Sequence, residues 1–266
     1  MKKKFALYSL FALLLLVGCS QDSDINSGTN AQIDKSGNRL ATGASAQDLL
    51  ANAKFDELLV EIGYVTGFQP TAEAIATFEQ FVRAHTFKEN VTFIYKELSS
   101  PNEETLTLTE IVNLEKENRT AYNEGTTLAM YIYFADAPTD TDDESADIVT
   151  LGAVYQNTSM VIYEATIRDL VGNSTLVSVA DVEGATLNHE FGHLLGLVNL
   201  GTPAINDHED LDAESHCNTE GCLMRAELQF GGPALKMMQN KASKGLSAIP
   251  TLDAECLLDL QSNGGR

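Results

Sequence analysis

The segment His189–Gly196, HEFGHLLG, constrains the fold of this 266-residue chain more than any other feature. Two histidines four positions apart lie on one face of a helix, about one turn from each other. Apolar residues such as Phe191 and Leu194 surround them, so the helix has to be buried, and Gly196 is a typical residue at a helix end. The sequence therefore predicts a buried helix from about Val182 to Val198.

The residue types on this helix point to metal chemistry. His189 and His193 can bind one Zn²⁺ together at about 2.0–2.1 Å. Glu190 stands beside them and can take a proton from a metal-bound water, whose pKa zinc lowers to roughly 7. Four of the five histidines of the chain fall between positions 189 and 216. The sequence thus predicts a hydrolytic zinc site, and no Ser-His-Asp arrangement, phosphate loop or dinucleotide fingerprint competes with it.

The rest of the chain alternates strand-like and helix-like segments. The expected strands are Leu58–Val65, Val91–Lys96, Thr127–Phe134, Val149–Tyr155 and Ser159–Ile167. The expected helices outside the histidine segment are Thr71–His85, Thr107–Tyr122 and Thr251–Gln261. The last two strands predict a hairpin, and residues 199–250 read as irregular, with Gly231–Pro233 as a turn. This order predicts an α+β fold in which helices pack on a mixed, twisted sheet.

The N-terminus has the pattern of a secretory signal. Three lysines precede an apolar run from Phe5 to Val17, which is too short for a membrane span, and Cys19 follows Gly18. This end resembles a bacterial lipobox, which implies cleavage before Cys19 and lipidation of its thiol; the alternative is an ordinary signal with a coincidental cysteine. We therefore expect a signal peptide over residues 1–18, a lipidated cysteine and flexible tether over 19–47, and one domain over 48–266. The expected location is the outer membrane, on its periplasmic face or at the cell surface.

The chain is strongly acidic, with a formal net charge of −21. Such a chain repels nucleic acid and anionic lipid surfaces, so the lipid anchor is the expected link to a membrane. The acidic run from Asp136 to Asp147 is expected to be a solvated loop. Ca²⁺ binding there is an alternative, although the spacing does not match an EF-hand loop. The sequence gives no indication of the oligomeric state.

Two motifs resemble those of metzincin zinc endopeptidases. The metzincin pattern is HExxHxxGxxH followed by a methionine turn, and this chain matches it up to Gly196 but has Asn199 at the third histidine. Further on, HCNTEGCLM from His216 to Met224 resembles the HCx4CxM segment of archaemetzincins. The resemblance implies that His216 is the third zinc ligand and that Met224 forms the turn. It also implies an active-site helix, a C-terminal helix and an antiparallel edge strand lining the cleft, for which Ser159–Ile167 is the candidate.

Three residues remain candidates for the third ligand of the single expected Zn²⁺. His216 has the motif context, His208 lies on the same inserted loop, and Asn199 stands at the usual position but offers only an amide oxygen. The second zinc site of archaemetzincins uses four cysteines, and we expect it to be incomplete because the chain has no downstream CxxC.

The cysteines after Cys19 allow one disulfide and one odd thiol. In an oxidising compartment the expected disulfide is Cys217–Cys222, and pairing of either residue with Cys256 is the alternative.

Two functions follow from these patterns. The chain resembles bacterial lipoprotein membrane metalloproteases in its lipobox and over most of its length from about Ala41 onwards, including its HEFGHLLGLVNLGT, HED, HC and CLM elements. This implies a zinc endopeptidase that hydrolyses extracytoplasmic proteins or peptides, with Glu190 as general base. The alternative, motivated by Asn199, is a degenerate surface lipoprotein that binds zinc or peptides without cleaving them.

Overall fold

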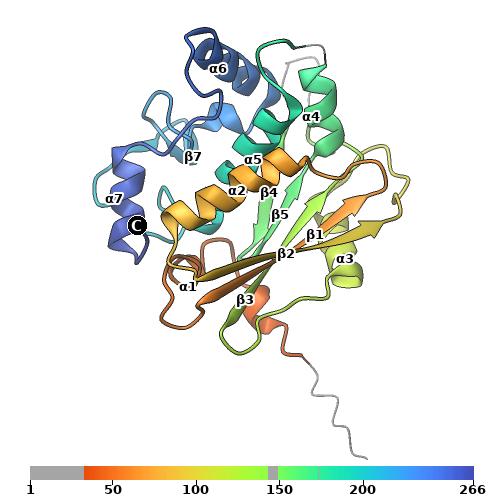
Figure 1. Ribbon diagram of the computed structural model, residues 1–266, viewed down its shortest axis with the longest axis vertical. Coiled ribbons are helices and arrows are strands. Elements are labelled where there is room, and N and C mark those ends of the chain that lie inside the picture. Colours follow the sequence, from red (N-terminus) through yellow and green to blue (C-terminus); the bar gives the residue numbers. More distant parts are fainter. Residues whose placement is uncertain (1–32, 143–148, 173) are drawn as a thin grey trace, which may run out of the picture. The chain divides into compact units, whose positions relative to one another are not determined.

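The computed structural model describes residues 33–142, 149–172 and 174–266, which belong to one compact unit, Ile33–Arg266. Its centre is a five-stranded mixed sheet with the strand order β2-β1-β3-β5-β4 (Figure 1). The strands are β1 (Glu57–Val65), β2 (Asn90–Leu98), β3 (Thr127–Phe134), β4 (Gly152–Gln156) and β5 (Ser159–Ile162). All neighbours are parallel except β4 and β5, which form an antiparallel pair with a register shift between Val154 and Gln156.

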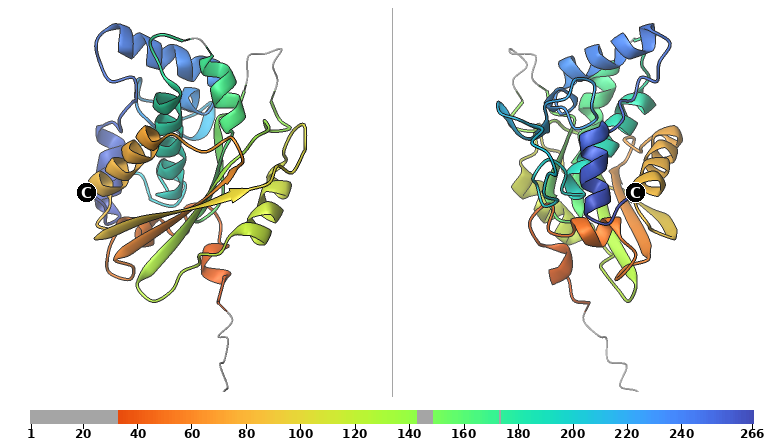
Figure 2. Two further views of the ribbon diagram at one scale, coloured as in Figure 1. Left: turned by 45° about the vertical axis from the view of Figure 1, so that its right-hand side comes forward. Right: turned by 90° about the vertical axis from the view of Figure 1, so that its left-hand side faces the viewer.

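The helices cover both faces of this sheet. They are α1 (Ala46–Leu50), α2 (Ala72–His85), α3 (Leu108–Asn118), α4 (Glu164–Val171), α5 (Val179–Leu194), α6 (Gly231–Ser243) and α7 (Ala254–Ser262). Short 3₁₀ helices lie at Ser36–Asn38 and Ala226–Leu228, and a small second sheet pairs β6 (Glu209–Asp210) with β7 (Ala213–Cys217). Helix α3 lies on the opposite side of the main sheet from α2 and α5 (Figure 2).

The alternation of side chains along β3 explains this layering. Ile132 and Phe134 face the large core under α2 and α5, whereas Tyr131 and Tyr133 face the smaller core that includes Ile111 of α3. Every residue of β3 after Thr127 is buried, as expected for a central strand covered on both faces. The expected mixed α/β fold with an antiparallel edge strand is confirmed.

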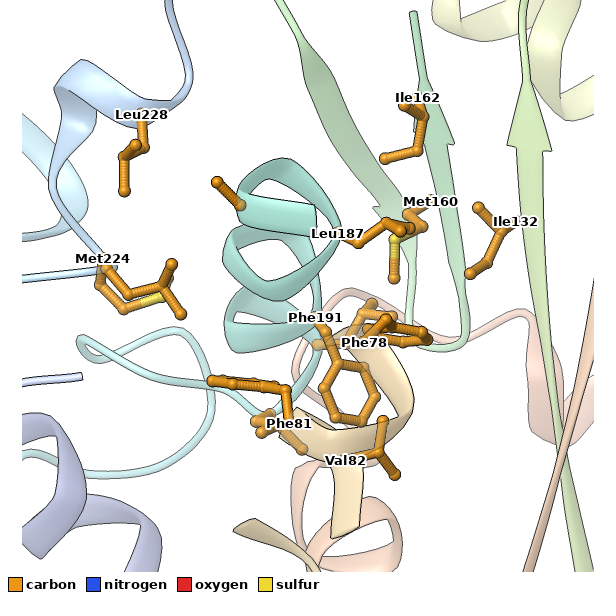
Figure 3. Close-up of a cluster of buried hydrophobic side chains, with 14 of the residues drawn as sticks. Phe78, Phe81, Val82, Ile132, Met160, Ile162, Leu187, Phe191, Met224 and Leu228 are labelled. Carbon is orange, nitrogen blue, oxygen red and sulfur yellow. The ribbon is translucent and has the colours of Figure 1, made fainter. Parts of the chain in front are cut away.

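Aromatic contacts fix α5 against its neighbours. Figure 3 shows Phe78, Phe81 and Val82 of α2 facing Phe191 of α5. The rings of Phe78 and Phe191 meet edge to face, with centroids 5.3 Å apart. The helix that carries the histidine motif is therefore held in the centre of the large core.

The helix ends follow local sequence signals. Thr71 caps α2, since its hydroxyl accepts a hydrogen bond from the backbone N–H of Ala74. Helix α5 begins after a capping box formed by Ser178 and Asp181, and Gly196 follows its end with φ of 73°.

Two local predictions are wrong. The segment Ser159–Ile167 was expected to be the antiparallel edge strand, but the edge strand is β4, and β5 lies between β3 and β4. Strand β5 also ends at Ile162, because the residues Glu164–Val171 form α4, in which Ile167 and Val171 are buried one turn apart. Helix α6 begins at Gly231, where the sequence predicted only a turn, since a proline is tolerated in the first turn of a helix.

The folded unit also begins earlier than the predicted tether allows. Asn38 is fully buried, and its side-chain amide donates to the carbonyl of Ala129 at 2.8 Å. Asn157 donates to the carbonyl of Gly37 and to the hydroxyl of Ser45. The signal peptide and Cys19 lie outside the described residues, and among the described helices none is long and apolar enough to cross a membrane.

Candidate metal centre

Helix α5 positions the first two candidate ligands. His189 and His193 lie one turn apart on the same face, and their Nε2 atoms approach each other to 3.2 Å. Their rings are nearly perpendicular, with an interplanar angle of 88°. Both nitrogens therefore converge on one point beside the helix, as the spacing predicted.

The small β6–β7 sheet brings His216 to the same point. The centroid of the His216 ring lies 5.4 Å from that of His189 and 5.0 Å from that of His193. The ligating atoms of the three histidines all lie within 4.8 Å of one another. Ser215, which precedes His216, has a φ of 62°, a left-handed conformation that bends the strand at the ligand. The structure thus brings His189, His193 and His216 together in what we call the three-histidine site.

Backbone carbonyls orient two of these rings. The Nδ1–H of His189 donates to the carbonyl of Leu223 at 2.8 Å, and that of His216 donates to the carbonyl of Glu214 at 2.9 Å. When Nδ1 carries the proton, Nε2 keeps its lone pair and faces the cluster. The Nε2 of His216 is buried and has no hydrogen-bond partner among the described residues. A buried acceptor without a partner is costly, and a bound cation would satisfy it, so the donor set fits a Zn²⁺ ion.

The electrostatics of the three-histidine site keep its rings neutral. Burial, together with the neighbouring His216, lowers the pKa of His189 to about 3. Burial and the other two rings hold the pKa of His193 well below its usual value, and burial also lowers that of His216. Neutral imidazole is the form that binds metal, so no proton competes for the Nε2 atoms at neutral pH.

Glu190 lies beside the three-histidine site and is only 2% exposed. Its Oε1 is buried without a hydrogen-bond partner among the described residues. Burial raises the pKa of this carboxyl to about 8. A Cβ atom at Gly152, the first residue of β4, would lie 2.8 Å from Cγ of Glu190 and 3.0 Å from Oε1. Glycine at this position therefore allows the carboxylate to lie against the edge strand, a relation that the motif alone did not reveal.

Met224 packs against α5 at Gly192, which lies between the two histidines of the motif in the sequence. It is fully buried, and a Cβ atom added at Gly192 would collide with its Sδ. The glycine inside the HEFGH motif thus makes room for the methionine that the sequence predicted as the turn residue. Leu223, whose carbonyl orients His189, immediately precedes it.

The other two candidates for the third ligand lie outside the three-histidine site. The side chain of Asn199 is exposed; it donates to Glu209 at 2.9 Å and accepts from the N–H of Ala204. His208 is buried elsewhere, with Nε2 at 2.8 Å from Asp259 and Nδ1 at 3.4 Å from Sγ of Cys217. The geometry therefore favours His216 as the third ligand.

The expected Cys217–Cys222 disulfide is not formed in the structure. Cys217, Cys222 and Cys256 are buried free thiols, and Sγ of Cys222 lies 3.7 Å from Sγ of Cys256. Helix α7 brings Cys256 next to the CxxxxC loop, so the alternative pairing of Cys222 with Cys256 joins neighbouring thiols, although no such bond is formed in the structure either.

The predicted acidic loop is described only in part. Residues 143–148 lie outside the described residues, and the carboxylate of Asp142 accepts a hydrogen bond from the N–H of Thr150 at 2.7 Å. Ca²⁺ binding there stays a prediction.

No protein-family model matches the sequence, and no curated protein matches it. Among solved structures, the chain is similar to an archaemetzincin from Methanopyrus kandleri, with 14% identity and a TM-score of 0.46 over 79% of this chain and 96% of that one. It is also similar to metalloproteinase-II from Bacteroides fragilis, with 14% identity and a TM-score of 0.41 over 80% of this chain and 54% of that one. The chain thus has an archaemetzincin and a metalloproteinase among its structural neighbours, and it carries a candidate metal site of three histidines beside a buried glutamate.

Proposed function

We propose that the protein is a zinc-dependent endopeptidase. The observation that carries the proposal is the pairing of the three-histidine site with Glu190. Three neutral imidazoles converge beside a buried carboxylate whose Oε1 has no partner among the described residues. A site that only binds a metal has no need of such a carboxylate, whereas hydrolysis needs a base beside the ligands.

His189, His193 and His216 would hold the ion. Zn²⁺ bound there would supply Lewis-acid polarisation of a peptide carbonyl and would lower the pKa of a bound water. Glu190 would accept a proton from the attacking water at Oε1 and deliver it to the leaving amine. Burial raises the pKa of this carboxyl, whereas a cation bound to the three histidines would lower it, so the ion would favour the carboxylate form that takes the proton.

The edge strand β4 would align the substrate. It pairs with β5 on one side only, so its outer backbone groups can pair with an extended peptide. Gly152 at its start adjoins Glu190, so a peptide on this edge would pass close to the base.

We also propose, from the sequence pattern alone, that Cys19 carries a lipid anchor and that the domain works outside the cytoplasm. Its substrates would then be extracytoplasmic proteins or peptides. Labelling of the full chain with palmitate checks the lipid anchor. The original protein should incorporate the label, and Cys19→Ala should not.

The test of the enzymatic proposal is Glu190→Gln. Glutamine keeps the size of the side chain but cannot take a proton, so the variant should keep its zinc. Its cleavage rate should fall by at least about 100-fold, which is the lower end of general-base effects. Release of new N-termini from a mixture of unstructured peptides measures the rate, and metal analysis measures the zinc. The control is Glu117→Gln, an exposed glutamate on α3 across the sheet, which should match the original protein.

Unchanged cleavage by Glu190→Gln would contradict the role of Glu190. Stoichiometric zinc at the three-histidine site, with no cleavage by the original protein, would instead favour a peptide- or zinc-binding lipoprotein.

A further inference from the structure

A cavity of about 550 Å³ lies beside helix α5 and takes no part in the proposed reaction. Its lining comes from α2, from segment 247–252 and from Leu257 of α7. From α5 it includes Asn188, the residue before the first histidine of the motif. Its volume lies within the range of about 300–1,000 Å³ that is usual for ligand pockets. We call this cavity the Asn188 pocket.

The Asn188 pocket lies on a different flank of α5 from the edge strand. Glu190 adjoins Gly152 of β4. Asn188 is two positions from Glu190, and two positions turn an α-helix by about 200°. Gly184, which is four positions before Asn188 and therefore on its face, adjoins Ile249 of the pocket instead. A molecule in the pocket would therefore leave the proposed substrate strand free.

Asn188 brings an unsatisfied polar group to this pocket. The residue is only 4% exposed, and its Oδ1 is buried with no hydrogen-bond partner among the described residues. A buried acceptor of this kind costs stability unless a donor reaches it. Nδ1 of His85, on the α2 side of the pocket, is also buried without a partner in the described part of the chain. The pocket therefore suits a ligand that brings hydrogen-bonding groups of its own.

The lining of the Asn188 pocket is uncharged. Burial lowers the pKa of His85, so its ring is neutral at neutral pH. The other lining residues are apolar, such as Phe81 and Ile249, or polar without a charge, such as Gln80 and Thr251. A charged group that entered would lose its hydration and meet no opposite charge. The pocket therefore disfavours charged ligands, including the termini of a peptide.

We propose that the Asn188 pocket binds an uncharged, apolar segment of another polypeptide, through one peptide group and the side chain beside it. The amide of Asn188 can accept a hydrogen bond at Oδ1 and donate from Nδ2, which matches the N–H and C=O of a peptide group. Apolar lining residues such as Ile249 would cover the side chain. The lining also includes the exposed residues Gln80, Ala84 and Ser247, so the pocket opens to solvent and the bound chain can continue beyond it.

Two hydrogen bonds link the pocket to the three-histidine site. The carbonyl of Thr251, which lines the pocket, accepts the N–H of Leu223 at 2.9 Å. The carbonyl of Leu223 in turn accepts the Nδ1–H of His189 at 2.8 Å. A segment that restrains Thr251 and Asn188 would thereby restrain the ring of His189, and it should tighten metal binding. This consequence rests on the proposed zinc site, whereas binding of the segment does not.

The probe for the pocket is N-acetyl-leucine amide, which carries one apolar side chain between two amide groups and has no charge. Ligand-observed NMR on the metal-free full chain should show binding with a dissociation constant of about 1–10 mM, as expected for so small a ligand. Free leucine carries both terminal charges and should bind at least about tenfold more weakly. Because the protein is metal-free, this result does not depend on the proposed peptidase activity.

Three variants locate the bound probe. Ala84→Leu narrows the pocket from an exposed position of α2 and should weaken binding at least about tenfold. Its matched control is Ala72→Leu, exposed in the first turn of the same helix and outside the lining, which should bind like the original protein. Asn188→Leu keeps a similar size without the amide and should weaken binding by at least about tenfold. No binding by the original protein, or equal binding by Ala84→Leu and Asn188→Leu, would overturn the proposal.

Zinc affinity tests the link between the pocket and the three-histidine site. Saturating N-acetyl-leucine amide should raise the Zn²⁺ affinity of the original protein and of Ala72→Leu by at least about fivefold, the lower end of usual coupling between sites. It should leave the Zn²⁺ affinity of Ala84→Leu unchanged. Titration with Zn²⁺ against a competing chelator measures these affinities. The same affinity of the original protein with and without the probe would overturn the link.

Discussion

Single hydrogen bonds decide which atoms of the three-histidine site can bind a metal. The carbonyls of Leu223 and Glu214 accept the Nδ1 protons of His189 and His216, so their Nε2 atoms are free to act as ligands. The carbonyl of Leu223 belongs to a segment far from α5 in the sequence. The carbonyl of Glu214 belongs to β7, the strand that also carries His216. They could not be predicted from the HEFGH motif, which specifies the histidines but not their tautomers.

The choice among His216, His208 and Asn199 was likewise open at the level of sequence. His216 lies 23 residues after His193, and only the path of the β6–β7 hairpin places its ring 5.0 Å from that of His193. His208 stands closer to α5 in the chain but points toward Asp259. Loop histidines carry no periodicity that reveals where they point.

Removal of His216 tests this assignment. His216→Ala should lower the affinity of the three-histidine site for Zn²⁺ by more than the roughly 10–100-fold that follows loss of a group that only orients a ligand. It should abolish cleavage in parallel. Asn199→Ala is the comparison, since Asn199 bonds only to its loop neighbours Glu209 and Ala204. Titration of both variants with Zn²⁺ against a competing chelator measures the effect, and a larger loss in Asn199→Ala would reverse the assignment.

The elements of the fold were predictable where apolar periodicity extends over several turns or a whole strand. Strand β3 has the predicted bounds, and α2 and β1 differ by one residue from the predicted ones. The prediction failed at β5 and α4, because a short apolar run followed by EATIRDLV fits a strand and a helix equally well. The prediction also failed at α6, because Gly231–Pro233 has the composition of a turn. Only the packing of the amphipathic residues that follow makes this segment the start of a helix.

The contact between α5 and Met224 can be tested with two glycines of the same helix. Alanine at either position should gain up to about 1 kcal/mol from helix propensity. At Gly192 the new Cβ would collide with Met224, and overpacking of this kind costs about 1–3 kcal/mol. At Gly184 it would meet Ile249 and Thr77 at 3.3 Å, a contact that small shifts can relieve.

Gly192→Ala should therefore be less stable than Gly184→Ala by about 1–3 kcal/mol, the cost of overpacking, in urea unfolding of the metal-free protein. It should also bind Zn²⁺ more weakly, because Met224 adjoins the Leu223 carbonyl that orients His189. Equal stabilities would show that Met224 does not press on α5 at this position.

On the scale of the whole molecule, buried carboxyls link stability to pH. Burial and the neighbouring Glu183 raise the pKa of Glu164 from 4.5 to about 9, although the contact with Arg168 opposes this shift. A carboxyl with a raised folded-state pKa binds its proton more tightly in the native state. Its contribution is complete below pH 4.5 and is lost as pH rises toward 9.

The contribution of Glu164 should therefore fall between about pH 5 and pH 9, the window set by these two pKa values. The fall should be visible as a loss of stability of the metal-free protein above about pH 7, where the histidines of the three-histidine site are neutral in both the folded and the unfolded state. Glu164→Gln removes the titrating group and should flatten the decline, whereas Glu117→Gln on the surface of α3 should leave it unchanged. Urea midpoints measured across this range check the expectation. The same slope in Glu164→Gln and in the original protein would show that other groups cause the decline.

The edge strand β4 has a consequence for which proteins could be cleaved. It offers only the five residues Gly152–Gln156, and its register is interrupted between Val154 and Gln156. A partner strand can therefore pair with it over a short stretch only. A substrate segment that pairs with β4 needs backbone N–H and C=O groups that are not already hydrogen-bonded. In a helix or in a strand inside a folded sheet these groups are already paired. The protein would thus select substrates by their conformation: loosely folded or damaged chains and flexible loops would be cut, while intact neighbours in the same compartment would be spared.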